Sequence, residues 1–145
     1  MTVVRGAAGA EPVVMDTMIV GALFSRKPLA AMYEPHVQGR PLVISFVTVA
    51  ELRYGALKAN WGEARREALE ARLSSMTVIP SDSDLATVYV ELRVSCEHIG
   101  HGLQAKIHEA DRWIAATAIR FGLPLISHDG IFQAVPGLNL IREPD

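Results

Sequence analysis

The chain has 145 residues and a formal net charge of −2, and half of its residues are apolar while about a fifth are charged. This length suits one domain with a single hydrophobic core, and the composition excludes a disordered or fibrous protein. The charge lacks the basic excess that is usual for proteins that grip nucleic acid through phosphates. Cys96 is the single cysteine, so no internal disulfide can form, and we expect a buried structural thiol in a cytoplasmic protein.

The beginning of the chain shows no feature that would direct it to a membrane. The apolar stretch from Val13 to Phe24 contains Asp16. It is too short and too charged to span a bilayer, and it lacks the uninterrupted apolar core of a secretion signal. Residues 1–12 are rich in Gly and Ala and have no periodicity. We therefore predict a flexible leader over 1–12, one domain over 13–145 and no membrane association.

The first half of the predicted domain contains two buried strands, each followed by a helix. A short apolar run at 13–15 leads into a helix over 19–24. A run rich in β-branched residues at 42–47 forms the second strand. The next helix is predicted to begin with Thr48 as its N-cap, because Glu51 stands three residues later and completes a T-x-x-E capping box.

The second half continues the alternation of helices and strands. In chain order the predicted elements are a helix at 62–73, a strand at 77–79, a long helix from a cap cluster at 81–84 to about 98, a helix at 108–121, and strands at 125–127 and 138–141. Strands that are apolar on both faces and alternate with helices are typical of parallel sheets. The sequence therefore predicts an α/β fold with a central parallel sheet and helices on both sides.

Four acidic residues fall where the predicted strands end and the helices begin. Asp16 follows the first strand, and Asp129 comes two residues after the strand at 125–127. Glu51 and Asp111 lie near the starts of two predicted helices. In an open parallel sheet, the carboxyl ends of the strands and the starts of the following helices border one crevice. All four carboxylates can therefore face the same crevice.

Clustered carboxylates point to a divalent cation, because like charges remain ionised together only when a cation neutralises them. Oxygen ligands favour magnesium or manganese over zinc. Such ions can activate water for hydrolysis of a phosphodiester bond. A second interpretation stays open at this point: each acidic residue could be only a helix cap or a turn residue, in a binding module without catalytic activity.

Four segments of the sequence resemble the motifs of VapC-type PIN-domain toxins in both order and spacing. They are Val-Met-Asp-Thr at 14–17, Val-Thr-Val-Ala-Glu-Leu-Arg-Tyr-Gly at 47–55, Asp-Arg-Trp-Ile-Ala-Ala-Thr-Ala at 111–118 and Leu-Ile-Ser-His-Asp at 125–129. The resemblance extends from about residue 13 to 141. Two positions depart from the pattern, because Met18 stands where the family often has Asn and Ile131 where it often has a polar residue.

The resemblance implies a PIN-like nuclease domain and an endoribonuclease that uses magnesium or manganese. It implies a toxin that forms a homodimer, cleaves transfer, ribosomal or messenger RNA, and is inhibited by a cognate antitoxin protein. Carried over by motif, the metal-binding catalytic residues are Asp16, Glu51, Asp111 and Asp129. Thr17 matches a hydroxyl position that can support the first carboxylate. A phosphatase of the haloacid-dehalogenase type is disfavoured, because its second aspartate would stand at Met18.

Three further groups of residues have both a functional and a structural interpretation. Loop histidines could bind zinc, although their spacing is loose and favours solvated side chains: His98, His101, His108 and His128. Basic residues near the crevice could hold phosphates or pair with neighbouring acids: Lys27, Arg53, Lys106 and Arg112. Apolar residues could line an antitoxin groove or pack in the core: Leu23, Phe24, Leu29, Met32 and Tyr33.

Overall fold

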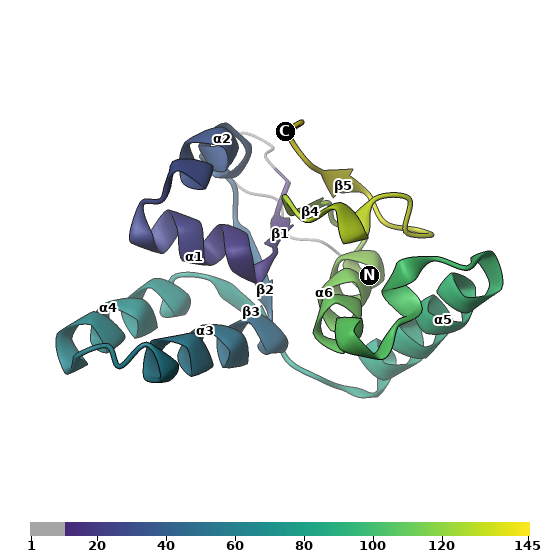
Figure 1. Ribbon diagram of the computed structural model, residues 1–145, viewed down its shortest axis with the longest axis horizontal. Helices are drawn as coiled ribbons and strands as arrows, with labels where there is room; N and C mark the ends of the chain where they lie inside the picture. The colour runs from purple at the N-terminus through teal and green to yellow at the C-terminus, as the bar shows by residue number, and fades with distance from the viewer. Residues whose placement is uncertain (1–10) are drawn as a thin grey trace.

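The computed structural model describes residues 11–145, and its centre is a five-stranded parallel sheet (Figure 1). The strand order is β3-β2-β1-β4-β5. The strands are β1 Val13–Met15, β2 Leu42–Ser45, β3 Thr77–Ile79, β4 Leu125–Ile126 and β5 Leu140–Ile141. All four neighbouring pairs run parallel. The predicted α/β class with a central parallel sheet is confirmed.

Within residues 11–145, six α-helices and three short 3-10 helices connect the strands. The α-helices are α1 Thr17–Ser25, α2 Pro28–Val37, α3 Phe46–Lys58, α4 Glu63–Ser74, α5 Ser83–Ile99 and α6 Glu109–Phe121. The 3-10 helices are η2 Gly102–Gln104, η3 Lys106–His108 and η4 Gly130–Phe132. None of the helices over this range has the length and apolar composition needed to cross a membrane. The leader predicted over 1–12 falls, for residues 1–10, outside the described residues.

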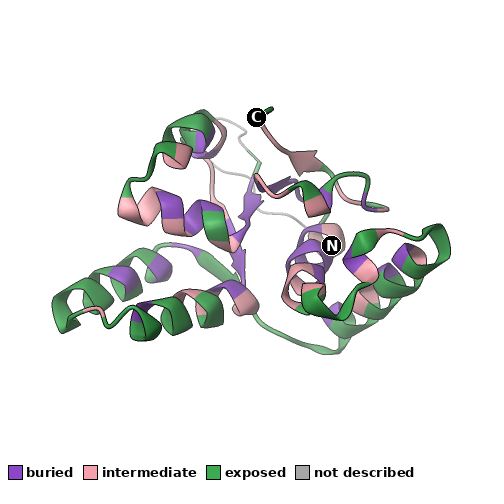
Figure 2. Cartoon of the chain, viewed as in Figure 1, coloured by how far each residue is buried: buried purple, intermediate pink, exposed green. Residues whose placement is uncertain are grey.

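Both faces of the sheet are covered by helices, and each face has its own hydrophobic core (Figure 1). Val14 packs with α5 and α6 on one face, whereas its neighbours Val13 and Met15 pack with α1 to α4 on the other. This follows from the alternation of side chains along a strand. The central strands β1, β2 and β4 are therefore buried on both sides, whereas the edge strands β3 and β5 and the outer surfaces of the helices are more exposed (Figure 2).

The start of α3 differs from its prediction. The capping box of Thr48 and Glu51 is wrong, because the N-cap is Ser45, whose hydroxyl accepts a hydrogen bond from the Val47 N–H at 3.1 Å. The strand that was predicted to reach 47 ends at Ser45, and Phe46 begins the helix. Thr48 is consequently a helical residue, and Glu51 lies in the second turn. Both side chains are free to make contacts other than capping.

Candidate active site

Asp16 lies at the carboxyl end of the central strand, where the order of the strands reverses. The chain leads from β1 to β2 and β3 on one side of it, whereas β4 and β5 lie on the other side. Such a reversal is the usual position of a ligand site in open α/β sheets. Asp16 is 6% exposed, and it also caps α1 because its Oδ1 accepts from the Thr17 N–H at 2.8 Å. Ser127 Oγ donates to the other carboxylate oxygen, Oδ2, at 2.7 Å.

Burial raises the pKa of Asp16 from 3.8 to about 6. The hydrogen bond from Ser127 opposes this rise in the pKa, and the negative charge of Asp111 adds to it. The Thr17 N–H lowers the pKa and the charge of Glu51 raises it, each by a smaller amount. Glu51 and Asp111 come from different helices, and each is close enough to act electrostatically on the same buried carboxyl group. Three of the four predicted site residues are therefore electrostatic neighbours.

Glu51 and Asp111 are each held by a partner on a neighbouring turn or element. Thr17 Oγ1 donates to Glu51 Oε1 at 2.6 Å. Thr17 was expected to support the first carboxylate, and here its hydroxyl contacts the second while its backbone N–H contacts the first. Asp111 lies in the first turn of α6, and its Oδ2 is 2.9 Å from Nδ1 of His108. Both carboxylates are more exposed than Asp16.

Asp129 is connected to the other acidic residues through Ser127. The backbone N–H of Asp129 donates to Ser127 Oγ at 3.0 Å, and the same hydroxyl donates to Asp16. The Asp129 carboxylate accepts from the Ile131 N–H at 3.0 Å and so caps η4. Asp129 is not among the charges that shift the pKa of Asp16. It lies beside the cluster but is less closely coupled to it than Glu51 and Asp111 are.

The side chains of this cluster provide hard oxygen donors of the kind that magnesium prefers. Over residues 11–145, no three Asp, Glu, His or Cys side chains converge closely enough to form a complete metal cage. Magnesium usually takes only one or two protein carboxylates and keeps several waters. The donor set fits a hydrated magnesium ion.

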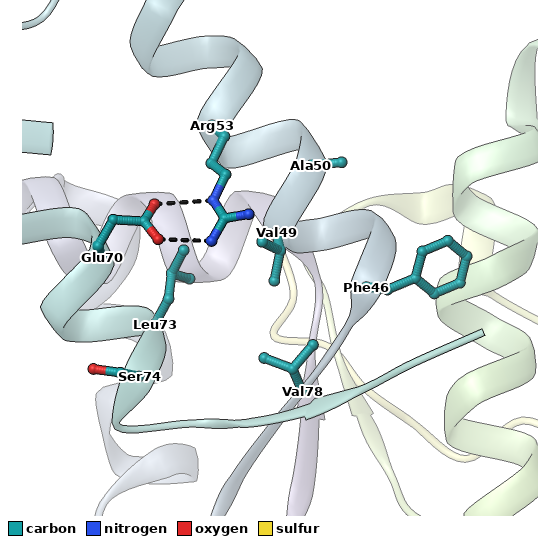
Figure 3. A pocket seen from close by; sticks show the side chains of 8 residues that line it. All are labelled: Phe46, Val49, Ala50, Arg53, Glu70, Leu73, Ser74 and Val78. Carbon is teal, nitrogen blue, oxygen red and sulfur yellow. Dashed lines mark hydrogen bonds and ion pairs between the residues drawn. The ribbon is translucent and has the colours of Figure 1, made fainter.

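Two of the basic residues near the crevice have structural partners. Arg112 is 2% exposed, and its guanidinium donates to the carbonyl oxygens of Leu103 and Ala105 at 2.8 and 2.6 Å. Neither interpretation from the sequence holds for Arg112, because its side chain is too buried to hold a phosphate and its partners are two carbonyl groups and the Tyr89 hydroxyl instead of acids. Arg53 pairs with Glu70 through two hydrogen bonds of 3.0 and 2.7 Å (Figure 3). Lys27 and Lys106 are exposed.

The histidines and the apolar residues take mostly structural roles. His101, His108 and His128 each make a hydrogen bond within the protein, and His98 lies in the last turn of α5. No zinc-type cluster forms among the residues that the structure describes. Tyr33 is fully buried, and three of the other candidate groove residues pack around the same core with partial exposure: Leu23, Phe24 and Leu29. Met32 is exposed. Cys96 is buried, as predicted.

Comparison with known proteins places these features in a family. The model of the PIN domain family matches residues 13–138. The chain is 31% identical over 126 residues to ribonuclease VapC5 of Mycobacterium tuberculosis, covering 86% of this chain and 87% of the relative. It is 30% identical over 115 residues to ribonuclease VapC2 of Haemophilus influenzae, covering 79% of this chain and 84% of the relative.

Solved structures give the same result. VapBC2 from Rickettsia felis, bound to a DNA fragment from its promoter, aligns with a TM-score of 0.74 and 26% identity over 90% of this chain and 98% of that chain. VapBC-5 from Mycobacterium tuberculosis aligns with a TM-score of 0.63 and 29% identity over 91% and 98%. The chain therefore belongs to the PIN-domain family, as a VapC-type ribonuclease toxin of a toxin–antitoxin system. The resemblance seen in the four sequence segments is confirmed, and nucleases of this type are generally metal-dependent.

Proposed function

We propose that this toxin is an endoribonuclease that hydrolyses RNA phosphodiester bonds with Asp16, Glu51, Asp111 and Asp129 as its catalytic, metal-binding carboxylates. Mg²⁺ is the proposed ion and Mn²⁺ its substitute. The observation that carries the proposal is the position of the buried Asp16 at the carboxyl end of β1. Burial raises its pKa to about 6, and the charges of Asp111 and Glu51 add to the rise. The charges of Glu51 on α3 and Asp111 on α6 both disfavour the ionised form of Asp16, and a divalent cation at this place would stabilise it.

Each carboxylate has a distinct task in the proposed site. When bound, the divalent ion would activate a water molecule and stabilise the oxygen that leaves phosphorus. Asp16 provides the buried anchor, because Ser127 and the Thr17 N–H fix both of its oxygens. Glu51 and Asp111 are more exposed and present oxygens toward solvent from two helices. Asp129 completes the cluster from the loop after β4.

The test is cleavage of structured RNA by the purified chain in the presence of magnesium. We expect cleavage by the wild type and by Asp84→Asn, a control that removes an exposed acid paired with Arg120. Asp16→Asn, Glu51→Gln and Asp111→Asn are expected to lose activity by at least about a hundredfold, as is the wild type in EDTA. Equal cleavage by the wild type with and without EDTA would contradict metal dependence.

We also propose three partners: an RNA substrate, a cognate antitoxin protein and a second copy of the chain. The solved relatives include toxin–antitoxin complexes, such as one from Klebsiella pneumoniae at 26% identity. A cavity of about 550 Å³ adjoins Glu51 and is lined by Met18, Leu29 and Trp61. An apolar segment of the antitoxin would fit this cavity and cover the acidic cluster.

The partner proposals are tested with the protein encoded beside this gene. A stable complex in gel filtration, together with loss of RNA cleavage on its addition, is the expected result. Light scattering of the toxin alone should give twice the mass of one chain. A monomeric mass at micromolar concentration would contradict the dimer without affecting the proposed chemistry.

A further inference from the structure

A short chain of hydroxyl groups leads from the interior of the protein to Glu51. Thr17 Oγ1 donates to Glu51 Oε1 at 2.6 Å. The Thr17 hydroxyl oxygen also lies 3.0 Å from Thr48 Oγ1. A hydroxyl group carries only one hydrogen. Because the Thr17 hydrogen points to Glu51, the hydrogen in the second contact must come from Thr48. The direction of donation is therefore Thr48 to Thr17 to Glu51.

The position of Thr48 in the fold suits donation to Thr17. It is fully buried, whereas Glu51 one turn later on the same side of α3 is exposed. Residues three apart on a helix are neighbours, so Thr48 lies behind the carboxylate as seen from solvent. Thr17, the first residue of α1, stands between them. Over residues 11–145, no other hydrogen-bond partner of the Thr48 hydroxyl is present.

We propose that Thr48 is a positioning residue of this ribonuclease: its hydroxyl orients Thr17, which in turn holds the Glu51 carboxylate beside Asp16. The inference rests on the proposed role of Glu51. Glutamate has several rotatable bonds, and an exposed one samples many rotamers unless a partner holds it. A site held by a supporting layer of hydrogen bonds keeps its carboxylates in productive geometry. The Thr17 hydroxyl itself keeps one orientation because it both accepts and donates.

Two substitutions separate positioning from simple packing. Thr48→Val keeps the volume of the side chain and removes the hydroxyl, whereas Thr48→Ser keeps the hydroxyl and removes a methyl group. If Thr48 only fills space, the serine variant should lose more activity than the valine variant, because serine leaves a small cavity. If Thr48 positions Glu51, the valine variant should lose more activity, because it lacks the hydroxyl group. Thr117→Val is the matched control, since Thr117 is equally buried but donates to the Trp113 carbonyl oxygen.

The experiment measures kcat and KM for RNA cleavage with magnesium, and the shift in melting temperature during titration with Mn²⁺ alone. For Thr48→Val we expect kcat to fall by about tenfold, with KM for RNA nearly unchanged, and the apparent affinity for Mn²⁺ to fall by about fivefold. Thr48→Ser should stay within about threefold of the wild type in both measurements. Thr117→Val should leave the kcat and the Mn²⁺ affinity unchanged.

The outcomes distinguish this inference from the proposed function. If the wild type cleaves RNA and Thr48→Val does so as well as Thr48→Ser, the positioning role is overturned while the nuclease proposal stands. If the wild type neither cleaves RNA nor gains stability with Mn²⁺, the proposed function fails and the role of Thr48 fails with it. A double variant, Thr17→Val with Thr48→Val, should be no worse than Thr17→Val alone, because both act through one chain of hydroxyls.

Discussion

Ser127 Oγ donates to Asp16 Oδ2 at 2.7 Å, and it accepts from the Asp129 N–H at 3.0 Å. One fully buried hydroxyl thus joins the carboxyl end of β1 to the loop that follows β4. Its hydrogen bond is the main interaction that holds down the pKa of Asp16 against the effect of burial. Asp16 and Asp129 lie far apart in the sequence, and their positions depend on this shared partner.

Ser127→Ala is therefore expected to affect both stability and activity. The substitution leaves Asp16 Oδ2 without its donor and the Asp129 N–H without an acceptor, which should lower the free energy of unfolding by about 1–3 kcal/mol. The pKa of Asp16 should rise further, so less of it is ionised at neutral pH and RNA cleavage falls. Urea unfolding and cleavage rates measure the two effects. The control is Ser75→Ala, which removes an exposed hydroxyl that donates to the Arg72 carbonyl; equal losses in both variants would contradict the expectation.

The raised pKa of Asp16 predicts how the stability of the metal-free protein depends on pH. The pKa is 3.8 for the ordinary carboxyl group and about 6 in the folded state, so the native protein holds this proton more tightly than the unfolded chain does. The contribution of Asp16 to stability is present below pH about 4 and is lost as pH rises through about 6. About two pKa units correspond to about 3 kcal/mol.

Asp16→Asn isolates this contribution, because asparagine remains neutral at every pH. In EDTA, the variant should be more stable than the wild type by up to about 3 kcal/mol at about pH 8, and the difference should vanish below about pH 4. Urea unfolding at several pH values measures it. A wild type that is more stable than Asp16→Asn at high pH in EDTA would show that the carboxyl group is not destabilised by its surroundings.

Magnesium should offset the lower stability of the wild type relative to Asp16→Asn. The ion binds the native carboxylates and not the unfolded chain, so it raises the free energy of unfolding, by about 2.7 kcal/mol at a concentration one hundred times the dissociation constant. The wild type should therefore gain stability with magnesium, and Asp16→Asn should gain little. Thermal melts over a magnesium titration test this. Sodium chloride at the same ionic strength separates binding at the site from screening of surface charges.

Substitution of Arg112 is expected to reduce the stability of the fold and not to act through RNA binding. Its buried guanidinium donates to two carbonyl groups and to the Tyr89 hydroxyl at 3.1 Å. Arg112→Met should lower the free energy of unfolding by about 3 kcal/mol, because buried acceptors lose their donors. Arg53→Ala, which breaks an exposed pair with Glu70, should cost less than about 1 kcal/mol. Urea unfolding of both variants shows whether the loss of stability depends on the burial of the arginine or only on its charge.

The parts of the fold that depend on local sequence could be predicted, and the parts that depend on distant partners could not. The strand at 77–79 matches β3, and the cap cluster at 81–84 contains Asp82, the N-cap of α5. These features depend on neighbouring residues. Helix α2 was not predicted, because Pro35 lies inside it and normally indicates a helix end.

The candidate site shows the same division. The acidic residues were proposed because the sequence places them after predicted strands or near the starts of predicted helices. Thr48 was interpreted as a cap because Glu51 stands three residues later, whereas its hydroxyl contacts Thr17, 31 residues earlier in the chain. Ser127 is an ordinary strand residue in the sequence. Its role depends on β4 lying beside β1, which follows from the topology and not from the local pattern.

The central place of β1 has a consequence for the cell that makes this toxin. Proteins emerge from the ribosome beginning at the N-terminus, so β1 and β2 can pair early, whereas β4 reaches its position beside β1 only when most of the chain has been made. Ser127 and Asp129 arrive with it. Translation interrupted before β4 would therefore release fragments that lack both Ser127 and Asp129. Harmful activity would belong to finished molecules alone.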